Sequence, residues 1–402
     1  MATLLVLAAG PLQLPAITTA RRMGLRVVAA DGDRDAPGLA LADVAHVINI
    51  LDPEACLDIA RREKIDGVIH ICSEVSMFSM GRINEELGLA GIDSATAIRA
   101  TNKEEMRRAF EAGGAPSPRS IGVTTEDEAL RALQAIGGPV IFKPSRNSGS
   151  RGITRLGEDV SPEQAAAALR YAIEESRDRS ALVEEYVEGP EFSVEILAFG
   201  GRNEVLAVTD KVTTGAPHFV ETGHSQPTRE PPDARAAIAE AAVQGVRALG
   251  IDWAAAHAEV KLSPRGPFLI EIGARLGGDF ITTELVPRST GIDMVEGAIN
   301  LALGRQPDLE PRHAPRGAAI RYLTPPPGRA LAVKGVDEAR RMPGVKVVEV
   351  DVGVGDTVPE VKSSLTRIGY VIAEGATADE AVANAEAARD AIVIETAGEP
   401  AP

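Results

Sequence analysis

The segment that decides the fold is "HAEVKLSPRGPFLIEIGAR", residues 257–275. Its two halves are mostly apolar and flank the turn "PRG", so the sequence predicts two strands joined by a short turn. Glu259 and Glu271 then occupy corresponding positions of a hairpin, where two carboxylates can point to one face and share a divalent cation. Such oxygen ligands suit Mg²⁺ better than Zn²⁺. The alternative is a solvated hairpin, which the apolar flanks disfavour because unpaired carboxylates there would be costly.

The composition indicates a soluble protein of two to four domains. The chain has 402 residues, of which 44% are hydrophobic, and its net charge is −16. This acidic balance argues against a nucleic-acid or anionic-membrane surface. Cys56 and Cys72 are the only cysteines, too few for a disulfide framework or a cysteine-rich metal site. The sequence has no apolar run long enough for a membrane span and no signal-peptide pattern, so we expect a cytoplasmic protein.

Strands and helices alternate in the first part of the chain. The expected strands are "TLLVLAAG", "LRVVAADGD", "AHVINI" and "DGVIHICSE", with helical segments between them. This alternation predicts a parallel α/β sheet over roughly the first 95 residues. The turn after the first strand holds a single glycine, so the dinucleotide fingerprint G-x-G-x-x-G is absent and a nicotinamide dehydrogenase is disfavoured.

From about Thr101 the pattern changes to runs of strands with few crossover helices, which predicts an α+β region. "TNKEEMRRAFEAGG" is an acid-capped amphipathic helix, and "ARAAIAEAAVQGVRALG" is a long alanine-rich helix. The Pro-rich stretch from Pro311 through "LTPPPG" is interpreted as a linker or crossover. The last seventy residues alternate short strands with the helix "ADEAVANAEAARDAI". We therefore expect three domains, at residues 1–97, 98–310 and 311–402.

A cationic loop, "IFKPSRNSGSRGI" at residues 141–153, follows one of these strands. One interpretation is an ordinary turn, because Gly and Ser commonly end strands. The other is that backbone N–H groups, Lys143 and Arg151 surround an anion, most plausibly phosphate. The loop lacks the full G-x-x-x-x-G-K-[ST] pattern of a P-loop, so its meaning depends on the segments downstream.

Four pieces together resemble the ATP-grasp superfamily across most of the chain. They are "TNKEEMRRAF", "PVIFKPSRNSGSRGI", "LVEEYVEGPEFSVEI" and the hairpin described above, in the order that this superfamily uses. The resemblance implies an ATP-grasp fold of mixed α/β and α+β character. It implies an N-terminal parallel α/β domain, a mobile lid subdomain at about 115–187 and a C-terminal closing subdomain.

The resemblance also implies roles for individual residues. Lys103 and Lys143 match two lysines that contact nucleotide phosphates, and the mobile lid loop matches Ser148, Gly149, Ser150, Arg151 and Gly152. Glu184 and Val187 match the hinge that binds adenine, and Glu191 matches the carboxylate that holds the ribose. Glu259 and Glu271 match the two magnesium ligands. Arg275 matches an arginine that binds phosphate and the acylphosphate intermediate. One departure concerns the metal: Gly273 stands where the superfamily often has an asparagine that completes the shell of a second metal, which leaves one or two metals open.

"EIGARLGGD", "HFVETGHSQPT" and "GPLQLPAI" are similar to the amino-acid ligase branch of the superfamily. In that branch, Glu221 and His224 would meet the acceptor amino group; a polar surface loop is the alternative. His257 shares a strand face with Glu259, where it contacts substrate or simply packs. The substrate side is further expected to include three residues: Glu74, Gly277 and Gly278.

The activity that the resemblance implies is an ATP-dependent carboxylate–amine ligase. ATP and Mg²⁺, with Mn²⁺ as a substitute, would convert a carboxylate into an acylphosphate that an amine attacks, and joining two amino acids is the first expectation. Partners would be small-molecule carboxylates and amines, without nucleic acid or membrane, in a possible homodimer. Alternatives are a phosphoribosylglycinamide-type enzyme of the purine pathway, a bicarbonate-activating enzyme, or a nucleotide-binding regulator without catalysis.

Overall fold

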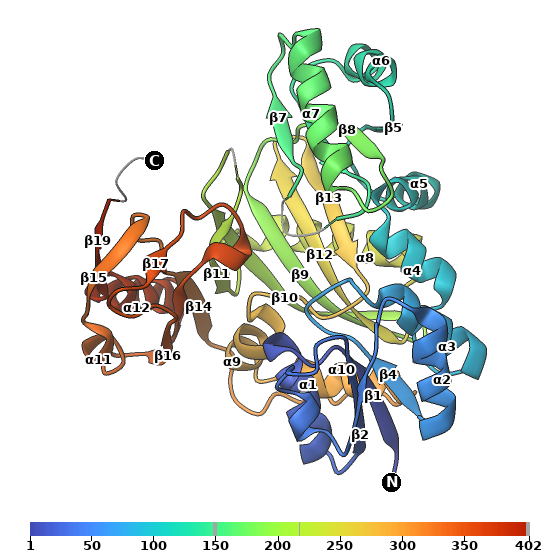
Figure 1. Cartoon of the computed structure of the whole chain (residues 1–402), viewed down its shortest axis with the longest axis vertical. Helices are drawn as coiled ribbons and strands as arrows, with labels where there is room; N and C mark the ends of the chain where they lie inside the picture. The colour runs from blue at the N-terminus through green and yellow to red at the C-terminus, as the bar shows by residue number, and fades with distance from the viewer. Residues whose placement is uncertain (148–150, 217, 399–402) are drawn as a thin grey trace.

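The chain was analysed as a computed structural model, which describes residues 1–147, 151–216 and 218–398. Figure 1 shows a large central sheet with the N-terminal domain at the bottom of the view, a small sheet with two helices at the top, and the C-terminal strands at the left. The ATP-grasp fold expected from the sequence, with its parallel and antiparallel parts, is confirmed.

The N-terminal domain contains four parallel strands in the order β3-β2-β1-β4. The elements are β1 (Thr3–Leu7), η1 (Pro11–Gln13), α1 (Leu14–Arg22), β2 (Arg26–Asp31), η2 (Leu39–Leu41), β3 (Val44–Val47), α2 (Pro53–Glu63), β4 (Gly67–Ile69) and α3 (Met77–Leu87). Alternate residues of β1 belong to two different cores, Leu5 and Leu7 to one and Leu4 and Val6 to the other. A strand buried on both faces reads as a continuous apolar run, which is why "LLVL" was recognisable.

The small sheet is antiparallel, in the order β5-β8-β6-β7. Its elements and the helices that lead into it are α4 (Ser94–Thr101), α5 (Lys103–Gly113), β5 (Ser120–Val123), α6 (Glu126–Ile136), β6 (Val140–Pro144), β7 (Thr154–Leu156), α7 (Pro162–Glu175) and β8 (Ala181–Glu185). Capping boxes at Thr125–Glu128 and Ser161–Gln164 begin α6 and α7. The two helices pack on this sheet around their own apolar core.

The central sheet has eight strands, in the order β13-β12-β9-β10-β11-β14-β18-β16. The elements around it are β9 (Glu191–Phe199), β10 (Arg202–Thr213), β11 (Glu221–Gln226), α8 (Pro232–Leu249), β12 (Ala254–Ser263), β13 (Gly266–Gly273), η3 (Ile281–Leu285), α9 (Val286–Thr290) and α10 (Met294–Ala302). The alanine-rich helix α8 packs against β9, β10, β12 and β13. Small residues let this helix lie close to the strands: a Cβ on Gly245 would come within 2.5 Å of Ile272.

The C-terminal part adds three strands to this large sheet and forms a three-stranded sheet of its own, β17-β15-β19. Its elements are β14 (Gly317–Tyr322), β15 (Gly328–Lys334), α11 (Val336–Ala339), β16 (Val345–Val350), β17 (Thr357–Val358), η4 (Ser364–Thr366), β18 (Gly369–Gly375), α12 (Ala378–Ala391) and β19 (Val393–Ala397). The interpretation of the Pro-rich stretch as a linker was wrong in one respect, because β14 lies inside it. All six residues of β14 are buried between β11 and β18, while the flanking prolines remain outside the strand.

Candidate active site

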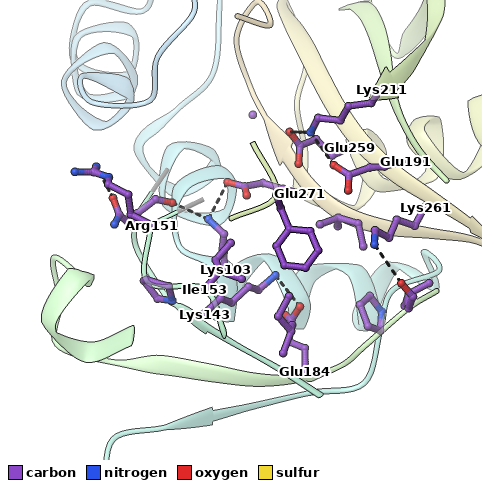
Figure 2. A pocket seen from close by; sticks show the side chains of 18 of the residues that line it. Lys103, Lys143, Arg151, Ile153, Glu184, Glu191, Lys211, Glu259, Lys261 and Glu271 are labelled. Atoms are coloured by element: carbon purple, nitrogen blue, oxygen red, sulfur yellow. Dashed lines mark hydrogen bonds and ion pairs between the residues drawn. The ribbon is translucent and has the colours of Figure 1, made fainter. Parts of the chain in front are cut away.

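A cavity of about 190 Å³ lies between the small sheet and the edge of the central sheet formed by β10, β9, β12 and β13. We call it the main cavity. Most residues expected at the site line it, and Figure 2 shows Lys103 beside Glu271 and Lys211 beside Glu259 and Glu191. The lining residues that had been expected are Glu74, Lys103, Lys143, Arg151, Glu184, Val187, Glu191, Glu221, His257, Glu259, Glu271 and Arg275. Segments separated by up to two hundred residues thus meet in one place.

Glu259 and Glu271 are direct partners across the β12–β13 hairpin, as the sequence predicted. The Lys211 ammonium donates to Glu259 at 2.9 Å, and the Lys103 ammonium donates to Glu271 at 2.9 Å. Despite burial, Lys211 and His257 hold the pKa of Glu259 well below its usual range. Glu259 is therefore an ionised oxygen ligand at the cavity wall, and the Glu271 carboxylate lines the same wall opposite it.

This pair fits Mg²⁺ of the kind that is held by one or two carboxylates together with substrate phosphates. Among the described residues there is no group of three or more His, Cys, Asp or Glu side chains placed to hold a metal by themselves. The donor set thus agrees with a metal that depends on nucleotide phosphates for the rest of its ligands. The number of metals stays a prediction.

Lys211 on β10 is a residue that the sequence reasoning missed. Its side chain is only 5% exposed, and its ammonium lies 2.7 Å from Glu191, 2.9 Å from Glu259 and 3.4 Å from Glu221. These carboxylates raise its pKa well above the usual value despite burial. The signal was available: a lysine in the apolar strand "VLAVTDKV" needs carboxylate partners.

Lys103 is directed into the main cavity by the cap of its helix. The Asn102 side chain accepts hydrogen bonds from the N–H groups of Glu104 and Glu105, at 2.9 and 3.1 Å, and so fixes the first turn of α5. Lys103 also donates to the backbone oxygen of Asn147 at 2.9 Å. The Lys103 ammonium therefore connects the start of the cationic loop to Glu271.

Lys143, at the end of β6, forms a buried ion pair with Glu184 at 2.6 Å. Arg107 on α5 approaches the same carboxylate with two nitrogens, at 2.8 and 3.1 Å. Burial lowers the pKa of Lys143 to about 8, whereas the pKa of Glu184 falls to about 2 because the two cations outweigh its burial. Glu184, expected near adenine, thus holds Lys143, and Arg107 is an addition that sequence reasoning missed.

Arg275 pairs with Glu74 of the N-terminal domain at 2.9 Å, and both side chains are largely buried. Burial and the nearby Glu271 raise the pKa of Glu74. Gly273 lies under the Arg275 guanidinium, since a Cβ there would be 3.1 Å from its central carbon. The absence of a side chain at position 273 therefore leaves room for Arg275 at the place where an additional ligand had been considered.

The Nδ1 atom of His257 forms a buried ion pair with Glu195 at 2.6 Å. The Nε2 atom of His257 lies 3.8 Å from Glu259. Despite burial, Glu195 raises the pKa of His257 to about 9. Gly277 is outside the lining of the main cavity and backs onto this pair instead: a Cβ there would be 2.5 Å from His257 Nδ1. Gly278 is also outside that lining.

Glu221 and His224 lie on β11, so the alternative of a polar surface loop is excluded. Glu221 lines the main cavity, whereas His224 is 1% exposed and does not. His224 Nε2 instead lies 3.2 Å from Asp279, a carboxylate that Arg367 holds with two nitrogens at 2.8 and 2.6 Å. Despite burial, Arg367 and His224 lower the pKa of Asp279. The structure thus separates two residues that were expected to act together.

The expected hinge and loop residues have different outcomes. Val187 lines the main cavity, and its backbone oxygen accepts from Lys261 at 3.3 Å; Figure 2 shows this contact beside Glu191. Arg151 lines the cavity and donates to the Asn147 side chain at 2.8 Å. Gly152 has a left-handed backbone with φ of 77° and packs against Pro144. The remaining loop residues lie outside the described part of the chain: Ser148, Gly149 and Ser150.

Comparison with known proteins agrees with this geometry. Residues 136–284 match the model of the ATP-grasp domain, so this part of the chain is an ATP-grasp domain. Residues 321–397 match the L-amino acid ligase C-terminal domain 2, so the similarity to the amino-acid ligase branch is confirmed. The solved L-amino acid ligase from Bacillus licheniformis superposes with a TM-score of 0.84 over 99% of both chains at 23% identity, which shows the shared fold.

The curated relatives have the names of two different kinds of enzyme. Chicken carnosine synthase 1 is 35% identical over 48% of this chain and 22% of its own, and alanine–anticapsin ligase from Bacillus subtilis is 28% identical over 67% and 63%. The chain thus spans less than two thirds of the length of either relative. Formate-dependent phosphoribosylglycinamide formyltransferase from Ignicoccus hospitalis is 28% identical over 94% of this chain and 92% of its own.

Among the described residues, no helix combines the length and apolarity needed to cross a bilayer.

Proposed function

We propose that this chain is an ATP- and Mg²⁺-dependent ligase that activates a carboxylate as an acylphosphate and couples it to an amine, joining two amino acids. The observation that carries the proposal is the convergence, in one cavity, of two lysines, two facing carboxylates and an arginine. The residues concerned are Lys103, Lys143, Glu259, Glu271 and Arg275. Phosphoryl transfer requires this combination, because catalysis consists largely of positioning the phosphates and offsetting their charge.

Each lysine would exchange a protein carboxylate for a substrate oxygen, whereas Arg275 would keep Glu74 and bind substrate with its other nitrogens. Lys103 and Lys143, now paired with Glu271 and Glu184, would donate to nucleotide phosphates. Glu259 and Glu271 would hold Mg²⁺, which when bound neutralises charge on the transferring phosphoryl group. Arg275, now paired with Glu74, has the planar fork that fits carboxylate and phosphate oxygens bidentately. Arg275 is therefore the group that would orient the acid and hold the acylphosphate.

The hinge side of the cavity would receive the nucleoside. Val187, Tyr186 and Ile270 supply apolar surface there, and Glu191 supplies the carboxylate for ribose hydroxyls. Arg151 and Asn147, which line the cavity, would contact the phosphates and help to exclude water, which protects an acylphosphate from hydrolysis. ATP, with Mn²⁺ able to replace Mg²⁺, is the cofactor set of this proposal, and a cytoplasmic homodimer is the proposed form.

The preference for amino-acid substrates rests on the C-terminal region. The match over residues 321–397 is to a domain described for L-amino acid ligases, and two relatives are named for joining an amino acid to another compound or for making carnosine. A second candidate is a purine-type ligase, which the match along 94% of the chain to phosphoribosylglycinamide formyltransferase favours. A regulator without catalysis is a weaker alternative, because all five residues of the convergent set are retained. Bicarbonate activation would use the same five residues; the absence of a biotin-attachment motif of the A-M-K-M type from the sequence weakens only a carboxylase that carries its own biotin.

The test is phosphate release from ATP and Mg²⁺ with amino acids offered singly and in pairs, followed by mass spectrometry of the products. Release that needs a pair, with a new mass equal to the two acids less one water, would support the proposal. Release with formate and a phosphoribosyl amine, and with no amino-acid pair, would favour the purine-type candidate. No release with any substrate would favour the regulator.

A further inference from the structure

A second hollow, of about 30 Å³, opens beside the main cavity where the N-terminal domain meets the small sheet. We call it the side hollow. Its walls include Glu74, Val75 and Phe78 on one side and Arg146, Asn147 and Arg177 on the other. Glu74 and Asn147 also line the main cavity, so the two spaces share a boundary next to Arg275. A ligand whose reacting group lies at Arg275 can therefore reach the side hollow with its other end.

The side hollow carries two guanidinium groups that the proposed mechanism does not use. Arg146 and Arg177 are held together by a backbone hydrogen bond from Arg177 N–H to Arg146 oxygen at 3.1 Å. Within the described residues, neither guanidinium has an ion-pair or side-chain hydrogen-bond partner. The neighbouring carboxylate, Asp178, lies outside the lining of the side hollow and accepts from the hydroxyls of Ser176 and Ser180 at 2.7 and 3.0 Å. Two guanidinium groups without an ion-pair partner can bind an anion through charge-assisted hydrogen bonds.

The opposite wall adds a second attraction for negative charge. Helix α3 begins here with Ser76 as its N-cap, and its first turn contains no acidic residue. The Ser76 side chain is fully buried, makes no capping bond, and its Oγ has no hydrogen-bond partner among the described residues. The N-terminus of an eleven-residue helix carries partial positive charge and unpaired N–H groups. Glu74, the acidic group on this wall, is already paired with Arg275 at 2.9 Å.

Phe78 gives the side hollow an apolar surface as well. It lies in the first turn of α3, and 39% of its surface is exposed, although it is a large hydrophobic residue. An aromatic ring beside two guanidinium groups suits a short aliphatic chain that ends in an anion. The volume of the side hollow is sufficient for one small anionic group.

We propose that the side hollow binds a substrate carboxylate that is not the one activated, through Arg146, Arg177 and the N-terminus of α3. This inference rests on the proposed ligase function and adds to it: one substrate carries a carboxylate that takes no part in the reaction and is separated from the reacting group by a short aliphatic spacer. The carboxylate has two possible sources, the α-carboxylate of an acceptor amino acid or the side chain of an acidic amino acid.

Calorimetric titration with Mg²⁺ and a non-hydrolysable ATP analogue tests this site without requiring turnover. The probes are L-glutamate, L-glutamine, L-alanine and L-alaninamide, titrated into the wild type, the double variant Arg146→Gln/Arg177→Gln and the control Arg131→Gln. Arg131 is an exposed arginine on α6 of the same small sheet, away from both spaces. An Arg146→Lys/Arg177→Lys variant checks that charge, rather than packing, is responsible.

We expect the wild type and the control to bind an acid at least about ten-fold more tightly than its amide, and the double Gln variant to lose this preference. A preference for alanine over alaninamide that the double Gln variant lacks identifies an α-carboxylate in the side hollow, and a lost preference for glutamate over glutamine identifies a side-chain carboxylate. The lysine variant should keep part of the preference that the Gln variant loses. The proposal is overturned if the wild type shows neither preference, or if the double Gln variant retains every preference of the wild type. If the wild type binds the acid more tightly than its amide but forms no amide product, the ligase function is contradicted and the side hollow is not. The failure of one proposal can therefore be told from the failure of the other.

Discussion

Glu259 and Glu271 stand directly opposite each other on β12 and β13, and a different lysine holds each carboxylate. Replacing Glu271 with Gln removes one carboxylate of the proposed metal site while keeping the shape of the side chain. We expect Mg²⁺-dependent turnover to fall at least about a hundred-fold, because the charge of the transferring phosphoryl group is no longer offset. Steady-state assays over a range of Mg²⁺ concentrations measure this loss.

Glu310→Gln is the matched control, since Glu310 is exposed and distant from the main cavity. It should leave turnover and its Mg²⁺ dependence unchanged. Normal turnover by the Glu271→Gln variant would show that this carboxylate is not a metal ligand.

Lys211→Met should destabilise the chain by about 3 kcal/mol, because three partly buried carboxylates lose their shared cation. Urea unfolding measures the change in the free energy of unfolding. Added Mg²⁺ should restore part of the loss, since a divalent cation can neutralise the same carboxylates. Lys334→Met, which breaks an exposed ion pair with Glu395, should have little effect. Equal stability of the wild type and Lys211→Met would rule out this account of the cluster.

ATP affinity should fall as the pH rises above about 8. Burial lowers the pKa of Lys143 to about 8, so the free protein loses this positive charge above that pH, whereas the nucleotide complex requires it. In the limit, affinity decreases about ten-fold for each pH unit. Titration of a fluorescent ATP analogue from pH 7 to 9.5 measures the slope.

Lys143→Arg should remove this pH dependence because arginine stays charged, while Lys103→Arg should preserve it. The effect on stability has the opposite sign: from pH 8 to the unfolded pKa near 10.5, the unfolded chain binds more protons at this residue, so its contribution to stability rises with pH. A flat affinity profile for the wild type would contradict the assignment of Lys143 to phosphate.

Gly277→Ala and Gly278→Ala form a matched pair with different expected results. A Cβ at position 277 would meet His257 Nδ1 at 2.5 Å and Glu195 Oε2 at 3.1 Å, whereas at position 278 it would meet only Cys72 oxygen at 3.6 Å. We expect Gly277→Ala to cost about 1–3 kcal/mol of stability, since it forces a buried ion pair apart. Gly278→Ala should stay close to the wild type in urea unfolding. Equal effects would mean that the His257–Glu195 pair is not tightly packed.

Much of the fold could be predicted from local sequence patterns. The elements that were missed depend on contacts between segments that are distant in the sequence. The facing pair Glu259–Glu271 was predictable because a hairpin register depends on a short, continuous segment. The strand β14 was hidden by the prolines around it. Its pairing with β11, almost a hundred residues away, decides its conformation.

The residues of the site also divide into those that the local sequence could indicate and those that depend on distant partners. Lys211 could have been suspected from its apolar strand, but its partners come from β9, β11 and β12. The separation of His224 from Glu221 follows from the alternation of side chains along β11, once that segment is known to be a strand. No spacing in the sequence indicates that Arg367 forms an ion pair with Asp279, which lies 88 residues away in the chain.

The most direct test of the central claim uses an acid substrate labelled with ¹⁸O in its carboxylate. If the chain activates that carboxylate as an acylphosphate, one labelled oxygen moves to the phosphate released during amide formation. Mass spectrometry of the phosphate should then show one ¹⁸O for each amide formed. Amide formation with wholly unlabelled phosphate would contradict the account, because the carboxylate oxygen would never have been joined to phosphorus.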